Sequence, residues 1–197
     1  MKKIFLFLAI VCTFSFFISC KKGEDDPAIS LKTRKARVTG EWHMTRGNIK
    51  VEEKVNGVVI GDLNYELTEN SYTYKRSGSG KDTTLKGDYK MSLTLEKDGA
   101  VQFSQSLNSN IFQGSGTWNF VSGVGDAKKK ESISFRITTL SGESYFVDLF
   151  NKSSTFFTYK IRELRNEKLV LESNAELVQT TDDGSSFYVT SIYTFVQ

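Results

Sequence analysis

The stretch that decides the fold is Tyr89-Lys90-Met91-Ser92-Leu93-Thr94-Leu95, which the turn signal Asp98-Gly99 follows closely. Apolar and polar residues alternate along it, and successive side chains of a β-strand point to opposite faces of a sheet. We therefore expect a strand with one buried face and one solvated face. The same alternation recurs in Ile133–Ile137 and Trp118–Phe120.

Short turn signals separate these segments. They are Asn56-Gly57, Asp98-Gly99, Ser141-Gly142, Asp183-Gly184 and Arg165–Lys168. Asn-Gly and Asp-Gly supply the positive φ angles that two-residue hairpin turns require. The pattern predicts an all-β chain, a single antiparallel up-and-down meander of about eight to ten strands. Closure into a barrel would remove the exposed edges of such a sheet, and an open two-sheet sandwich is the alternative.

The amino terminus predicts export. Lys2 and Lys3 precede an apolar run, Ile4 to Ile18, which is shorter than the roughly 20 residues of a membrane-spanning helix and suits a signal peptide. Phe17-Ile18-Ser19-Cys20 resembles a bacterial lipobox. The resemblance implies removal of residues 1–19, acylation of Cys20, and attachment to the outer membrane of a cell envelope, facing the periplasm or the surface.

The remaining chain divides into a tether and one domain. Residues 20–37 are polar at their start and are expected to be a flexible tether with one helical turn near Leu31–Lys35. Residues 38–197 are long enough for one sizeable core. Without residues 1–19, the 26 Lys and Arg become 24, against 23 Asp and Glu. This near-neutral balance argues against nucleic-acid binding.

The residues that carry chemistry are sparse. His43 is the single histidine, and it lies next to Trp42, so alternation should point it outward. Thr181–Gly184 lacks the spaced oxygen ligands of calcium loops. Acylation would consume Cys20, which leaves no thiol nucleophile and no disulfide. We therefore expect no catalytic residue, no metal site and no cofactor.

A resemblance to lipocalins rests on Gly40-Glu41-Trp42, Gly116-Thr117-Trp118, Tyr159–Leu164 and Leu169–Leu171. In this order behind a lipobox, these motifs are similar to those of the lipocalin-like lipoproteins of Gram-negative bacteria. The resemblance spans residues 38–197 and implies that Gly40 and Trp42 plug the closed end of the barrel. Lipocalins also place an arginine over that tryptophan, for which Arg136, Arg162 and Arg165 are the candidates.

Two functions fit these observations. In the first, the barrel lumen holds a small apolar or amphipathic ligand, lined by the aromatic residues Trp42, Tyr72, Tyr74, Tyr89, Trp118, Phe135 and Tyr159. In the second, the same side chains fill the lumen, and the barrel docks an envelope protein. Lys128–Lys130 and Phe156-Phe157 point to the second function, because adjacent residues of a strand cannot both face one core.

Overall fold

The structure is a computed structural model, and it describes residues 32–78, 82–121, 132–143, 149–150, 154–180 and 185–197, with the side chains of 174–180 left aside. The predicted signal peptide, Cys20, the start of the tether, Lys128–Lys130 and the Asp183-Gly184 turn lie outside these residues.

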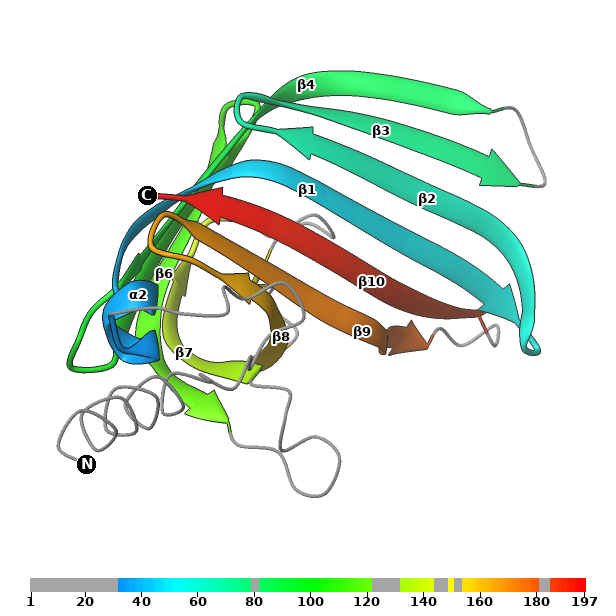
Figure 1. Ribbon diagram of the computed structural model, residues 1–197. Coiled ribbons are helices and arrows are strands. Elements are labelled where there is room, and N and C mark those ends of the chain that lie inside the picture. The colour runs from blue at the N-terminus through cyan, green and yellow to red at the C-terminus, as the bar shows by residue number, and fades with distance from the viewer. Residues whose placement is uncertain (1–31, 79–81, 122–131, 144–148, 151–153, 181–184) are drawn as a thin grey trace, which may run out of the picture.

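The described residues form one short helix and ten strands (Figure 1). They are α2 Arg34–Val38, β1 Gly40–Val55, β2 Val58–Thr68, β3 Ser71–Gly78, β4 Thr83–Leu95, β5 Ala100–Leu107, β6 Asn110–Val121, β7 Ser132–Ser141, β8 Phe156–Leu164, β9 Lys168–Thr180 and β10 Ser185–Val196. The predicted all-β meander is confirmed. All strand pairs are antiparallel, and the sheet closes into a barrel when β1 joins β10 on one side and β2 on the other.

The number of strands differs between the two ends of the barrel. At one end Gly40–His43 of β1 pairs directly with Ser92–Leu95 of β4, so eight strands complete the ring there. Further along, β1 pairs with β2, and the hairpin of β2 and β3 separates it from β4. We call the eight-stranded end the narrow end.

Six strands, in an order given by the pairing of the sheet, continue beyond the ring as a curved extension, which we call the flared sheet (Figure 1). Its order is β4, β3, β2, β1, β10 and β9. β4 contributes Thr83–Asp88 to it, because β5 pairs only with the later residues Tyr89–Leu95. β9 contributes the residues after Glu172, where its pairing with β8 ends.

Alternation along the strands places the core as predicted. Met91, Leu93 and Leu95 of β4 are buried, whereas the residues between them are at least partly exposed. The Asn56-Gly57 turn joins β1 to β2 with φ angles of 52° and 81°, which confirms the predicted hairpin. Burial of apolar area is the dominant driving force for such a core, and the buried apolar residues form one cluster inside the barrel.

The helix α2 lies against the narrow end. Thr33 caps it, since its hydroxyl accepts a hydrogen bond from the Ala36 amide at 3.2 Å. Val38, the last helical residue, is fully buried, and the Arg37 guanidinium donates to the Leu164 carbonyl of β8. The helix begins slightly later than the turn expected near Leu31–Lys35, and it holds the end of the predicted tether against the barrel.

Candidate binding site

Five of the seven aromatic residues that were expected to line a lumen are buried inside the barrel: Trp42, Tyr89, Trp118, Phe135 and Tyr159. The polar atoms of three of them are bonded to main-chain carbonyls. Trp42 Nε1 donates to Val38 at 2.8 Å, Trp118 Nε1 donates to Glu96 at 3.0 Å, and the Tyr159 hydroxyl donates to Leu149. Since buried polar groups need partners, these bonds fix the rings as parts of the core.

Phe150 fills the centre of the barrel, although it belongs to the connection between β7 and β8. Its ring centroid lies 4.7 Å from that of Phe103, 5.0 Å from Phe135 and 5.3 Å from Phe157. Tilted and edge-to-face rings at such distances attract one another beyond the area they bury. Phe150 is thus a plug supplied by a connection, and no strand pairing depends on its side chain.

Gln105 is the unusual residue of this interior. It sits at an inward position of β5, opposite Met91 and Phe112, and only 2% of it is exposed. Among the described residues none hydrogen-bonds its Oε1 atom. An amide buried without a partner costs about 1–3 kcal/mol, so it calls for an explanation.

Gln105 and the plug are linked through Phe103. Phe103 precedes Gln105 by two residues on the same face of β5, and the Phe103 ring stacks on Phe150. Phe112, which faces Gln105 across the β5–β6 pair, also packs against Phe103 with centroids 5.4 Å apart. A molecule in the place of the Phe150 ring would therefore meet aromatic walls, and Gln105 lies one inward position along β5 from one of them, Phe103.

Tyr72 and Tyr74, the other two expected lining residues, lie on the flared sheet. Tyr74 is paired with Tyr65 of β2 and with Leu85 of β4, and the two tyrosine ring centroids are 4.9 Å apart. The pKa of Tyr65 is raised to about 12, mainly because the side chain is buried and to a lesser extent because Tyr74 and Tyr72 are close. Ile49, Tyr65, Tyr74 and Leu85 are cross-strand neighbours in one row of the sheet. Exposure rises along this row from the buried Ile49 to Leu85, which is 54% exposed. Tyr72 is partly buried against the edge of the core, and neither Tyr72 nor Tyr74 is among the buried aromatic residues of the lumen.

Apolar side chains are also exposed on the outside. Phe156 is 60% exposed, whereas Phe157 packs on Phe150, which confirms that only one of the pair faces the core. The Arg136 guanidinium carbon lies 5.5 Å from the Phe156 ring centroid. Val58, Val59 and Ile60 are exposed just after the turn between β1 and β2.

The buried arginine of the narrow end is one that the lipocalin resemblance did not suggest. Arg136 and Arg165 are exposed and Arg162 is half-buried, while Arg37 is buried beside Val38, whose carbonyl accepts the Trp42 indole bond. Arg37 immediately precedes a residue of the predicted core, and that proximity was the available signal.

The described residues hold no group of three or more His, Cys, Asp or Glu that could bind a metal ion. His43 is exposed, as alternation predicts. No described helix has the length and hydropathy of a membrane span.

Comparison with known proteins found no matching family model, no similar curated protein and no solved structure of similar fold.

Proposed function

We propose that this chain is a lipid-anchored binding protein of the cell envelope, which holds a small apolar or amphipathic ligand in its barrel. Cys20 would carry the anchor, as the lipobox resemblance implies. The observation that carries the ligand proposal is the buried Gln105 side chain, whose Oε1 atom has no partner among the described residues and which lies next to Phe103 on the inward face of β5. A core selected only for stability gains nothing from such an amide, whereas a ligand with one polar group would satisfy it.

On this proposal, binding exchanges the Phe150 ring for the ligand. The ligand displaces Phe150, takes over its contacts with Phe103, Phe135 and Phe157, and meets Gln105 with its polar end. The exchange is feasible because Phe150 comes from a connection, so it can leave without breaking a strand ladder. Ligand affinity is then reduced by the cost of removing the plug.

The fluorescent probe N-phenyl-1-naphthylamine, which is apolar apart from one N–H group, tests this exchange by titration. Phe150→Ala should bind it about tenfold to a hundredfold more tightly than the parent, because burying a phenyl side chain is worth about 1.5–3 kcal/mol. Gln105→Met should bind it more weakly, and Phe156→Ala, which alters an exposed ring, should match the parent. Phe150→Leu serves if Phe150→Ala does not fold. Equal affinities in all variants, or no binding at all, would reject the lumen site.

The second candidate function is protein docking by a packed barrel. Exposed Phe156 favours this function, because its large aromatic side chain on β8 lies outside the core and aromatic side chains often anchor protein interfaces. Phe156→Ser should then abolish recovery of an envelope partner by the tagged protein while the melting temperature stays unchanged. Unaltered recovery would exclude Phe156 from any docking surface.

A further inference from the structure

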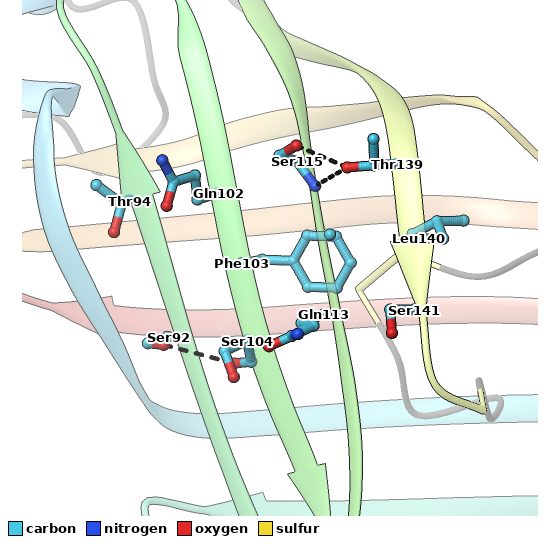
Figure 2. A pocket seen from close by; sticks show the side chains of 11 residues that line it. Ser92, Thr94, Gln102, Phe103, Ser104, Gln113, Ser115, Thr139, Leu140 and Ser141 are labelled. Carbon is cyan, nitrogen blue, oxygen red and sulfur yellow. Dashed lines mark hydrogen bonds between the residues drawn. The ribbon is translucent and has the colours of Figure 1, made fainter.

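The outer wall of the barrel holds a second feature, a groove of about 550 Å³ across β4, β5, β6 and β7 (Figure 2). Small-molecule sites commonly enclose about 300–1,000 Å³. The groove lies on the outside, because its polar residues alternate with the buried residues of the same strands. Gln102, for example, stands between the buried Val101 and Phe103.

The lining of the groove is polar and uncharged. Eight of its eleven residues are Ser, Thr or Gln, and none is charged. Charged residues make up 25% of the chain and prefer the surface, so about two would be expected among eight outward positions.

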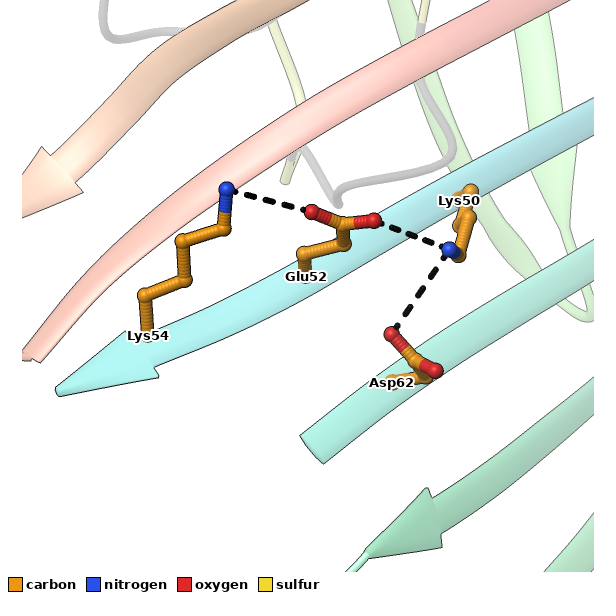
Figure 3. Close-up of polar contacts among 4 residues, drawn as sticks. All are labelled: Lys50, Glu52, Lys54 and Asp62. Carbon is orange, nitrogen blue, oxygen red and sulfur yellow. Dashed lines mark hydrogen bonds and ion pairs between the residues drawn. The ribbon is translucent and has the colours of Figure 1, made fainter. Parts of the chain in front are cut away.

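The outer wall of the flared sheet shows the contrast (Figure 3). There Lys50 Nζ lies 2.9 Å from one Glu52 oxygen and 3.9 Å from an Asp62 oxygen, and Lys54 Nζ lies 3.3 Å from the other Glu52 oxygen. The hydrogen bond to Glu52 is the main reason that the pKa of Lys50 is raised. The lining of the groove is thus uncharged, although other outward positions on the same strands carry charges, such as Lys90 of β4 and Arg136 of β7.

Much of the hydrogen-bonding capacity in the groove is unused. Within the described residues, the side chains of Thr94, Gln102, Ser104, Gln113 and Ser141 form no hydrogen bond with the protein. Each hydroxyl and each amide can both donate and accept. These groups come from four adjacent strands and face one space (Figure 2).

The groove is also fixed in shape. The Ser115 hydroxyl bonds to that of Thr139 at 2.7 Å, and the Ser115 amide donates to the same Thr139 oxygen at 3.2 Å. Gly114 allows β6 to approach β7 closely, since a Cβ there would stand 2.3 Å from the Thr139 carbonyl oxygen and 2.7 Å from the Phe103 ring. Preorganised donors and acceptors lose little entropy when a ligand binds.

We propose that this groove binds a neutral, polyhydroxylated ligand, namely a short stretch of uncharged glycan. A sugar hydroxyl donates and accepts in the same way as the Ser, Thr and Gln side chains that face it. An anionic ligand would find no cation in the lining, and an apolar ligand would bury polar groups without partners. The groove shares Phe103 with the barrel interior, but its polar side chains lie on the outer face, and the proposal does not depend on the ligand proposed for the interior.

Titration of the protein, purified in detergent from cells that express the full chain, with maltohexaose, cellohexaose, mannohexaose and chitohexaose, followed by calorimetry, tests the proposal. At least one of these neutral glycans should bind saturably, and Gln102→Ala and Gln113→Ala should each weaken it by about tenfold, as expected for loss of one amide that forms two bonds. Asn119→Ala removes an exposed amide of β6 outside the groove and should leave binding unchanged.

Three results would overturn the proposal. They are absence of binding by all four neutral glycans, tighter binding of oligogalacturonate, which is the anionic counterpart, and an equal loss in Asn119→Ala and the groove variants. Melting curves of the three variants, which should coincide with that of the parent, separate loss of binding from loss of folding.

Discussion

Replacing Gln105 by methionine is expected to stabilise this protein. The amide is 98% removed from solvent and its oxygen has no described partner, so the folded state carries its desolvation cost without a compensating bond. That cost is about 1–3 kcal/mol for a buried unsatisfied group. Methionine has a similar length and volume, and unbranched side chains adapt to irregular cores, so the packing term should be small.

The gain should therefore approach about 1–3 kcal/mol in the free energy of unfolding. For a chain of this size, each kcal/mol raises the melting temperature by about 2–4 °C. Urea unfolding followed by tryptophan fluorescence gives the free energy, because Trp42 and Trp118 are both buried. Gln102→Met makes the same chemical change on the outer face of β5 and should stay within about 0.5 kcal/mol of the parent.

Loss of more than about 1 kcal/mol in Gln105→Met would refute the reasoning, since removal of an unpaired amide cannot cost that much without overpacking. A gain in stability together with weaker probe binding is the combination expected of a residue kept for function at the expense of stability.

The other predictions concern Trp42 at the narrow end, the lipid anchor at Cys20 and Tyr65. Trp42→Ala should lower the free energy of unfolding by about 3–5 kcal/mol, measured by urea unfolding, because the ring is fully buried and its Nε1 bond to Val38 is lost. A loss under about 1 kcal/mol would show that the narrow end does not depend on this ring. Cys20→Ser should move the protein from the membrane pellet to the soluble fraction, since acyl chains anchor by about 0.8 kcal/mol per buried methylene; a mutant that still resists carbonate extraction would contradict lipidation. The raised pKa of Tyr65 predicts a loss of stability between about pH 10, where the unfolded tyrosine ionises, and about pH 12, where the folded one does. The loss should be smaller in Tyr65→Phe by urea unfolding at pH 9 and pH 11, and an identical difference in both proteins would mean that Tyr65 is not desolvated.

The strands could be predicted because their signal is local. Alternation of the kind seen in Met91, Leu93 and Leu95 reports one buried face directly, and Asn56-Gly57 defines its turn by backbone sterics alone. The direct pairing of Gly40–His43 with β4 could not be predicted, since it joins residues about 50 positions apart and depends on which register buries the most surface.

The candidate site divides in the same way. Gln105 falls in the inward register of Val101, Phe103 and Leu107, so the pattern contained the anomaly of a polar residue at a core position. The role of Phe150 had no such signal, because a connection has no periodicity and its aromatic side chain enters the core by tertiary packing alone. Aromatic composition suggested a lined lumen, and only the structure distinguishes side chains that line a space from those that fill it.

The direct pairing of β1 with β4 makes the β2–β3 hairpin an insertion into an already complete ring. The eight-stranded closure therefore does not require pairing with this hairpin, although Leu67 of β2 packs in the core. The two parts of the chain thus meet different constraints. We expect substitutions to be tolerated better at the exposed Val58–Ile60 of the hairpin than at the buried positions of the ring.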